Sequence, residues 1–488
     1  MKPLFLCLAP LVCLAAIPND LAPAVDMARQ APGEFAADAL IRIAASGKLD
    51  KPTRISLLEE AFRRAAEAQQ PFKRRASILK VAGNAGFLQR AYQQNLDGLS
   101  LRSRAVDAML PLDHVKARTL LEEIAPLQLP KVGCEGYLAY DVSLFYEVLG
   151  RVAAQSFTPK EVAAGKATGL LVQYVSAISS ASEVEPVARM LLDSQLSKAD
   201  FQSVLSAFSG ALGKVYGDDR SYTASAGAAA QQILRLVGEA RKRELSPLPL
   251  IEAYRLYLVN NLAGNRCADD DLMAQGEGYT LGNGAAAASL GTPEADFFNK
   301  NLATPPILPL HEEEVTPAKI EGAATGLRSC QDPECQQLAT QYRGLIFDAS
   351  GTPLSNAQRD SAEWRDRLQQ FLNAMAAWKN SSDNSGTDQF RDKCALYSAL
   401  MGVMPGGPDR DRVLLEWLNY LEDNPVEQQD RIGWFLPVNS LIGRVALDPL
   451  GLAKVKDALG KTRDPVIALY VELERIVPRT PDQIMPLL

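Results

Sequence analysis

The sequence predicts an all-α protein, built from many short antiparallel helices in an α-solenoid or helical array, with essentially no sheet. Helix-start signals recur along the chain, and the apolar residues between them repeat with helical spacing. Runs that alternate apolar and polar residues, as strands do, are nearly absent. These observations predict about fifteen to twenty helices.

The helix starts are marked by serine, threonine or aspartate followed by proline. The side-chain oxygen accepts a hydrogen bond from a free backbone N–H, and proline fits the first helical position because it has no N–H to leave unpaired. Such pairs include Thr158-Pro159, Ser246-Pro247, Thr292-Pro293, Thr316-Pro317, Asp332-Pro333, Asp448-Pro449, Asp464-Pro465 and Thr480-Pro481. We also predict capping boxes that pair Thr158 with Glu161, Ser182 with Glu185, and Ser355 with Gln358.

Several segments place apolar residues on one helical face. They are Leu57–Ala65, Ala117–Ile124, Val184–Leu192, Ile251–Leu262 and Val413–Leu421. A further face joins Phe390, Cys394, Tyr397, Met401 and Met404. This spacing predicts that Cys394 is buried as a small apolar residue with a free thiol.

One short segment of the sequence is partly repeated later in the chain. Leu57-Leu58-Glu59-Glu60-Ala61-Phe62 returns 63 residues later as Leu120-Leu121-Glu122-Glu123-Ile124-Ala125, which suits two repeats of about thirty residues. The chain thus resembles helical-repeat proteins of the α-solenoid, tetratricopeptide-like class, although the tetratricopeptide signature fits no window. It is also broadly similar to exported proteins of soil bacteria to which no activity is attached. Neither resemblance transfers a functional residue.

Composition divides the chain into two helical blocks. Residues 25–262 form the predicted N-terminal block and residues 331–488 the C-terminal block. Between them, residues 263–330 are rich in glycine and proline and carry only short periodic pieces, so we predict an irregular connection there.

The first residues read as an export signal. Lys2 precedes a short apolar run that ends at Ala16, as in a signal peptide. Cleavage after Ala16 or after Ala24 is compatible with the sequence. We prefer Ala24, because Ala22-Pro23-Ala24 has the small-x-small form that signal peptidase requires, and we assign residues 1–24 to the leader. The mature chain is then expected to be periplasmic or secreted, with no transmembrane segment.

The charge balance argues against a nucleic-acid partner. The formal net charge is −7 at pH 7, which gives polyanion binding no electrostatic support. Three short basic clusters are interpreted as solvated helix faces. They are Arg63-Arg64, Lys73-Arg74-Arg75 and Arg241-Lys242-Arg243.

Four other cysteines follow the leader: Cys134, Cys267, Cys330 and Cys335. Asp332-Pro333 is predicted to start a helix, which leaves Cys330 in the preceding loop, where it can fold back onto Cys335. Elimination then pairs Cys134 with Cys267. An oxidising compartment would allow both disulfides.

Few side chains suited to catalysis are present. The chain has two histidines, His114 and His311, and no recognisable dinucleotide, phosphate-loop, zinc-protease or serine-hydrolase motif. We therefore expect no metal and no cofactor.

Carboxylates remain as candidate site residues. Asp269, Asp270 and Asp271 follow Cys267, while Glu135 and Asp141 lie beyond Cys134 with two tyrosines between them. A Cys134–Cys267 bridge would gather these acids into a site for a cation or for acid–base chemistry on a sugar. The alternative, which we favour, is that the aspartates solvate a loop and the tyrosines pack.

Two classes of function fit these observations. The first is a protein- or peptide-binding or scaffolding module of the cell envelope, which needs no catalytic residues. The second is an exported all-helical carbohydrate-active enzyme that uses paired Asp and Glu residues. We favour binding. A groove lined by aromatic rings, with two acids facing one another, would instead favour the enzyme.

Overall fold

The all-α prediction is confirmed. A computed structural model describes residues 17–76, 83–132, 138–216, 221–262, 333–379, 387–426, 430–448 and 452–485. Within these ranges the chain forms twenty-two helices and a single two-stranded sheet. The helix number exceeds the predicted fifteen to twenty.

The first block, described between residues 17 and 262, contains thirteen helices and both strands. Its helices are α1 (Ala22–Gln30), α2 (Gly33–Ala45), α3 (Lys51–Ala65), α4 (Gly83–Tyr92), α5 (Gly98–Met109), α6 (His114–Glu122), α7 (Ser143–Gln155), α8 (Pro159–Ala163), α9 (Lys166–Val175), α10 (Ala181–Asp193), α11 (Lys198–Leu212), α12 (Ser221–Lys242) and α13 (Leu248–Leu262). The strands are β1 (Arg74–Ala76) and β2 (Leu138–Tyr140).

The second block, described between residues 333 and 485, contains nine helices. They are α16 (Pro333–Ile346), α17 (Asn356–Arg359), α18 (Ala362–Ala377), α19 (Thr387–Val403), α20 (Pro408–Glu422), α21 (Arg431–Leu447), α22 (Ala453–Leu459), α23 (Pro465–Ile476) and α24 (Pro481–Ile484).

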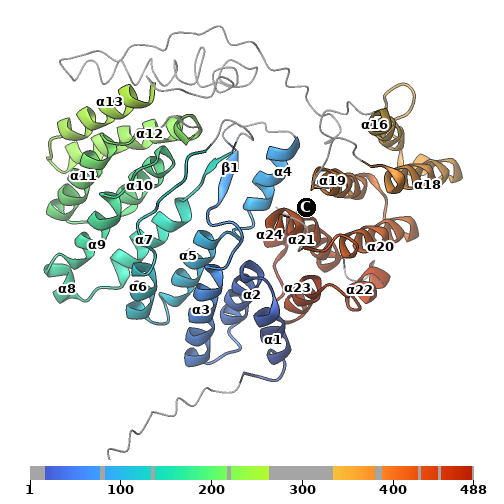
Figure 1. Cartoon of the computed structure of the whole chain (residues 1–488), viewed down its shortest axis with the longest axis horizontal. Helices are drawn as coiled ribbons and strands as arrows, with labels where there is room; N and C mark the ends of the chain where they lie inside the picture. The colour runs from blue at the N-terminus through green and yellow to red at the C-terminus, as the bar shows by residue number, and fades with distance from the viewer. Residues whose placement is uncertain are drawn as a thin grey trace, which may run out of the picture.

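In the first block the helices stack as hairpins in two rows. One row runs through α2, α5, α7, α10 and α12, each packed on the next, and α9, α11 and α13 follow one another in the second row. Each hairpin alone leaves an apolar face exposed, which its neighbour covers. The rows follow an arc that ends at α13 (Figure 1).

The second block extends the arc from the other side. Helix α16 packs on α18, α19 packs on α21, and α20 packs on α22. Both α21 and α22 pack in turn on α23. Helix α23 packs against α1 and α2, and α21 packs against α4. The beginning of the first block therefore lies in the middle of the arc, between α13 and α16 at its ends (Figure 1).

Three aromatic rings fill the junction between the blocks. The Phe435 ring lies 4.2 Å from the Tyr470 ring and 5.1 Å from the Phe35 ring, centroid to centroid. All three side chains are buried, and they belong to one core cluster that runs through both blocks. The blocks therefore share hydrophobic surface.

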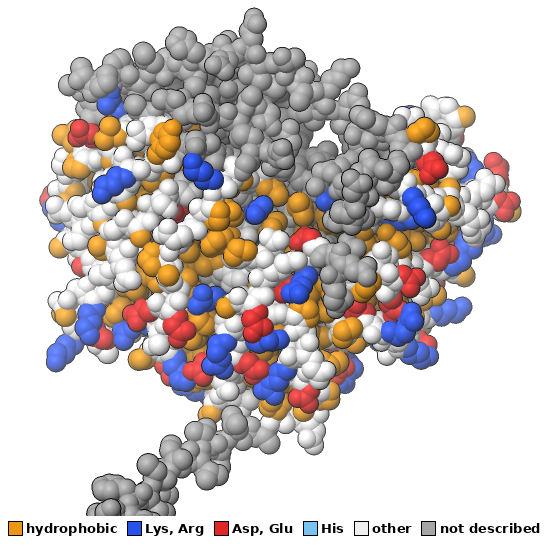
Figure 2. All heavy atoms as spheres, viewed as in Figure 1, with side chains coloured by type: hydrophobic (Ala, Val, Ile, Leu, Met, Phe, Trp, Pro, Cys, Tyr) orange, Lys and Arg blue, Asp and Glu red, His pale blue; other side chains and the backbone are white. Residues whose placement is uncertain are grey.

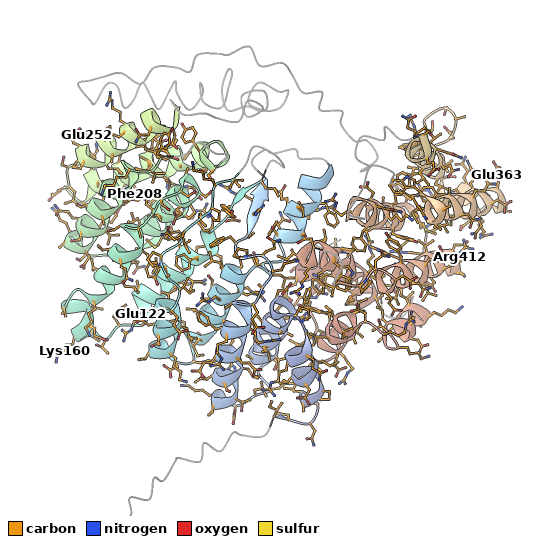
Figure 3. The ribbon with its side chains drawn as sticks, viewed as in Figure 1. Glu122, Lys160, Phe208, Glu252, Glu363 and Arg412 are labelled. Carbon is orange, nitrogen blue, oxygen red and sulfur yellow. The ribbon has the colours of Figure 1, made fainter. Side chains whose placement is uncertain are left out.

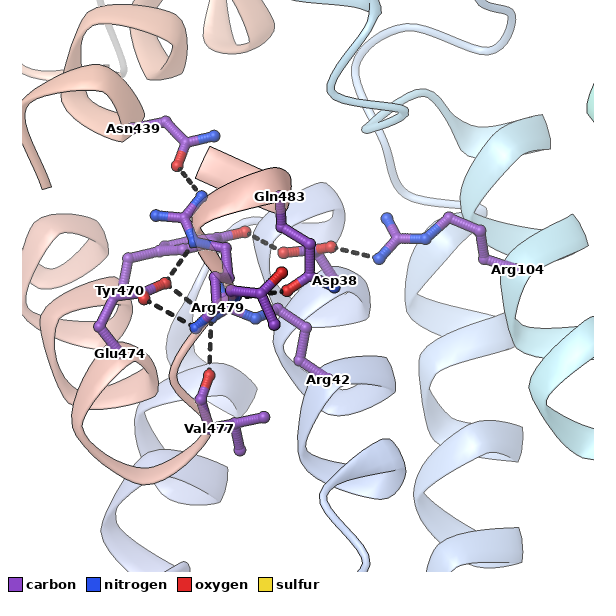
Figure 4. A network of polar contacts seen from close by, with 10 residues as sticks. Asp38, Arg42, Arg104, Asn439, Tyr470, Glu474, Val477, Arg479 and Gln483 are labelled. Atoms are coloured by element: carbon purple, nitrogen blue, oxygen red, sulfur yellow. Dashed lines mark hydrogen bonds and ion pairs between the residues drawn. The ribbon is translucent and has the colours of Figure 1, made fainter. Parts of the chain in front are cut away.

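A polar network crosses the same junction (Figure 4). We call it the junction network, and its side chains are Asp38, Arg42, Arg104, Asn439, Tyr470, Glu474 and Arg479. Asp38 accepts hydrogen bonds from Arg104 at 2.6 Å and from the Tyr470 hydroxyl at 2.8 Å. Burial alone would raise the pKa of Asp38, but the charges of Arg104 and Arg42 and these hydrogen bonds hold it below its ordinary value.

Most of the helix-start predictions that fall within the described ranges are confirmed. The capping boxes of Thr158 with Glu161 and of Ser355 with Gln358 begin α8 and α17. Proline occupies the first position of α16, α23 and α24, as the Asp-Pro and Thr-Pro pairs predict. The pairs at Thr292 and Thr316 lie outside the described residues.

One predicted capping box is wrong. Helix α10 begins two residues earlier than expected, and its box pairs Ser180 with Glu183 rather than Ser182 with Glu185. The earlier start lets Glu183 accept a hydrogen bond from the buried Tyr146 hydroxyl at 2.6 Å. Tertiary contact thus selects between two overlapping local signals.

Most residues of the predicted apolar faces are buried where their side chains are described. Leu57, Leu58, Ala61, Phe62 and Ala65 are all buried on α3. Cys394 is buried on α19 with a free thiol, beside the other predicted residues of its face. Burial raises its pKa far above the ordinary range, so the thiol stays protonated and packs as an apolar group.

The cluster Lys73-Arg74-Arg75 does not lie on a helix, which corrects the sequence interpretation. Arg74 and Arg75 belong to β1, which pairs antiparallel with β2, and Arg74 lies opposite Tyr140. Lys73 forms an ion pair with Asp141 at 3.2 Å. Because β1 has only three residues, its sequence shows no alternation of apolar and polar side chains. The interpretation as a solvated helix face rested on the run of basic residues alone.

The face of the molecule shown in Figure 2 carries charges of both signs. Lysine and arginine alternate with acidic side chains over the lower half of the face in Figure 2. Figure 3 contrasts the buried Phe208 with the exposed side chains Glu122, Lys160, Glu252 and Glu363. Among the described helices, none has the length and hydropathy needed to cross a bilayer.

Candidate functional site

A cavity of about 290 Å³ opens where the two blocks meet. We call it the junction cleft. Its main lining side chains are Gln70, Arg74, Phe87 and Tyr92 from the first block and Phe390, Arg391, Asp430 and Trp434 from the second. Concave sites that combine apolar walls with a few converging polar groups are the usual places for ligands.

Asp430 is the acidic side chain of this lining. It caps α21, accepting a hydrogen bond from the Gly433 N–H at 3.0 Å, and it also accepts one from Gln70 at 3.4 Å. Burial raises its pKa, while these hydrogen bonds and the charges of Arg391 and Arg74 act in the opposite direction.

The packing around Gly433 leaves no room for a side chain at this position of the cleft wall. A Cβ atom at this position would lie 2.7 Å from Asp430 Oδ2 and 3.4 Å from Phe87 Cε1. Any side chain would therefore collide with the capping carboxyl and press on the aromatic wall. Absence of a Cβ lets α21 and α4 approach one another here.

Arg74 reaches the cleft from the two-stranded sheet. Its guanidinium carbon lies 5.5 Å from the centroid of the Tyr140 ring, within cation–π range. Lys73, the preceding residue, forms an ion pair with Asp141. Burial raises the pKa of Asp141, but the charge of Lys73 and hydrogen bonds from Ser143 bring it below its ordinary value.

Aromatic rings form the apolar part of the wall. Arg391 lies over the Phe87 ring, with its guanidinium carbon 6.0 Å from the centroid. The Tyr92 hydroxyl donates to Gln70 Oε1 at 3.2 Å, and burial raises the pKa of Tyr92 to about 12. Trp434 is buried and donates its indole N–H to a backbone carbonyl at 2.7 Å.

Hydrogen bonds across the junction hold the walls in place. Gln94 donates to the Ile432 carbonyl at 3.3 Å and accepts from Asn439 at 2.9 Å. The Arg431 guanidinium pairs at 3.3 Å with Glu34, a fully buried carboxylate on α2. These contacts bring together residues more than three hundred positions apart, so the cleft depends on the docking of the blocks.

Most of the predicted acidic cluster lies outside the described residues. This applies to Glu135, Asp269, Asp270 and Asp271. Asp141 is described, and it is engaged with Lys73 and with the backbone of Ser143 rather than lining the cleft.

The cysteine and histidine predictions are tested only in part. Cys134, Cys267 and Cys330 lie outside the described residues, and Cys335 is placed in the first turn of α16. No disulfide is present in the described part of the chain. His114 is exposed at the start of α6, and His311 lies outside the described residues. Within the described ranges no three His, Cys, Asp or Glu side chains gather as a metal site.

Comparison of the chain with protein-family models, with curated proteins and with solved structures finds no match.

The cleft combines two guanidinium groups with four aromatic rings and one carboxyl. Arginine binds carboxylates through paired N–H donors, and aromatic walls bury apolar side chains. Sequence reasoning missed this site because its parts come from both blocks. One local signal was present: Asp430 precedes the apolar run from Ile432, as a helix cap does.

Proposed function

We propose that this protein is an exported binding module of the cell envelope, whose junction cleft holds a carboxylate-bearing segment of a peptide or protein partner. One observation carries the proposal: Arg74 and Arg391 both line a cleft in which four of the eight other lining residues are aromatic. A C-terminal carboxylate or an acidic side chain would pair with the arginines, and its apolar neighbours would pack on the rings.

The charge of the cleft supports an anionic ligand. Arg74 and Arg391 place two guanidinium groups in the lining, beside the single carboxyl group of Asp430. Since burial raises the pKa of Asp430, a bound carboxylate would favour its protonated form further. Nothing in this arrangement requires a bond to be made or broken.

The binding test uses a photo-crosslinking residue at Leu88, a lining residue of the cleft on α4. The full chain is expressed in a bacterium, irradiated in the intact envelope, and analysed by mass spectrometry. The same crosslinker at Val162, which is 47% exposed on α8, provides a control outside the cleft. We expect an adduct with a specific partner from Leu88 that does not form from Val162.

The partner identified in this way is then titrated against purified variants. Arg74→Ala is expected to raise the dissociation constant at least tenfold, because one charge-assisted hydrogen-bonding group is lost. Arg235→Ala, on the exposed face of α12, should leave it within twofold. Equal losses in both variants, or the same adducts from both crosslinking positions, would contradict a role for the cleft.

The carbohydrate-enzyme alternative receives less support from this geometry. A pair of carboxyl groups is needed to cleave a glycosidic bond by general acid and base. In the described lining of the cleft, Asp430 has no second carboxyl facing it. Asp97 also influences Tyr92, but it is fully buried as the cap of α5 and cannot reach a substrate.

We further propose that the export leader ends at Ala16 rather than at Ala24, our preference from sequence. Helix α1 begins at Ala22 and packs against α2 and α23, and both Leu21 and Ala24 are fully buried. Cleavage after Ala24 would remove both side chains and the first helical turn. The intact mass of the exported protein should therefore correspond to a chain that starts at Ile17, and a chain that starts at Val25 would refute this proposal.

A further inference from the structure

A second cavity lies at the other end of α21. Its volume is about 600 Å³, and helices α1, α21, α22 and α23 form its walls. We call it the α21–α23 pocket. Its apolar walls are Met27, Ile442, Val445, Leu459, Ala468 and Val471. Both its size and its largely apolar lining are typical of small-molecule sites.

Arg479 lines this pocket and also belongs to the junction network (Figure 4). Its Nε approaches Glu474 Oε1 at 2.5 Å, and its Nη1 donates to Asn439 at 2.6 Å. The third nitrogen, Nη2, is buried and has no hydrogen-bond acceptor among the residues that the structure describes. A buried donor of this kind costs free energy until it finds an acceptor.

The charges of the junction network do not balance. Arg104 pairs with Asp38, while Arg42 and Arg479 share the single carboxylate of Glu474. Three guanidinium groups therefore face two carboxylates, at side-chain exposures between 10% and 25%. A buried charge without a counter-charge is unfavourable, so an anion beside Arg479 would stabilise the network.

The remaining walls indicate an alkyl chain. Apart from Lys456, Glu474 and the ion pair of Arg475 with Glu472, they are built from apolar side chains, most of them on helices whose backbone groups are already paired within each helix. A peptide would leave its own amide groups unpaired against such a surface, which is costly, whereas an alkyl chain has none. The charged side chains of the lining are Lys456, Arg475 and Arg479 against Glu472 and Glu474, so the lining carries one more positive than negative group.

We propose that the α21–α23 pocket binds a single-chain alkyl carboxylate, with the carboxylate at Arg479 and the chain against the apolar walls. This site is separate from the junction cleft, which involves the opposite end of α21, and it does not depend on the proposed peptide partner.

Isothermal titration of the full mature chain with decanoate tests the proposal, with decylamine as a probe of equal chain length and opposite charge. One decanoate should bind per chain, at least tenfold more tightly than decylamine. Arg479→Gln should raise the decanoate dissociation constant at least tenfold. Arg463→Gln, a change at a side chain 82% exposed, should leave it unchanged.

A second variant tests the pocket independently, in case Arg479→Gln does not fold. Val471→Phe fills the pocket without touching the junction network, and it should weaken decanoate binding at least tenfold while the circular dichroism spectrum stays native. Unchanged decanoate binding in Val471→Phe, or decylamine binding as tight as that of decanoate, would overturn the proposal. Arg74→Ala, in the junction cleft, should bind decanoate like the wild type.

Discussion

Replacing Phe435 with alanine is expected to lower the free energy of unfolding by about 3–5 kcal/mol. The side chain is 1% exposed and packs between Tyr470 of α23 and Phe35 of α2. Its removal leaves a cavity at the junction that rigid helices from both blocks cannot close. Urea denaturation, followed by far-ultraviolet circular dichroism and by tryptophan fluorescence, measures the loss.

The two signals also report on how the blocks depend on one another. All four tryptophans, Trp364, Trp378, Trp417 and Trp434, lie in the second block, whereas circular dichroism reports helices of both. In the wild type the two transitions should coincide, and in Phe435→Ala they should separate. Leu447→Ala, at a 37% exposed position on the same helix, should change stability by less than about 0.5 kcal/mol. A similarly small change in Phe435→Ala would show that the blocks share no core.

Changing Asp97 to asparagine is expected to raise the free energy of unfolding at pH 7 by about 1–3 kcal/mol. Asp97 is fully buried at the start of α5, where it accepts a hydrogen bond from the Ser100 N–H at 2.9 Å. Burial raises its pKa from an ordinary value of 3.8 to about 6. Asparagine also caps helices well, so the variant keeps this hydrogen bond and removes the buried charge.

The pH dependence gives this prediction a definite sign. Below about pH 4, Asp97 is protonated in the folded and unfolded chains alike, and the charge costs nothing. Between pH 4 and pH 6 the unfolded chain releases its proton first, so the wild type loses stability as the pH rises. The advantage of Asp97→Asn should grow over this interval and then level off.

Asp50 provides the matched control for this variant. It caps α3 in the same way, accepting a hydrogen bond from Thr53 N–H at 2.9 Å, but it is exposed, and hydrogen bonding to the side chain and the backbone of Thr53 lowers its pKa. Asp50→Asn should therefore show no gain in stability that grows from pH 4 to pH 6. An equal gain in both variants would mean that burial of Asp97 is not the cause.

Local signals predicted the individual helices well. Asp464-Pro465 begins α23 because a cap and a proline act within one turn, and the face from Val413 to Leu421 is buried because helical spacing fixes which residues point inward. The start of α10 was harder to predict. Ser180 and Ser182 each precede a glutamate by three residues, and the glutamate of the box that forms, Glu183, also accepts a hydrogen bond from the distant Tyr146.

The candidate sites were not predictable from one sequence. Asp38 and Tyr470, which hydrogen-bond across the junction, are 432 residues apart, and no local pattern relates them. Arg74 belonged to a basic cluster that composition assigned to a solvated surface. It lines the junction cleft because β1 pairs with β2 and α21 docks on α4. These are consequences of tertiary packing, which spacing along the chain does not encode.

The position of α1 and α2 in the middle of the arc affects the order in which the chain can fold. These helices are synthesised first, yet the helix that covers them, α23, emerges more than four hundred residues later. Contacts so distant in sequence close late, because a long loop must first be ordered. Until then, the apolar surface around Phe35 stays open to wrong partners and to aggregation. We therefore expect chaperones to protect the N-terminal helices while the C-terminal helices are still being made.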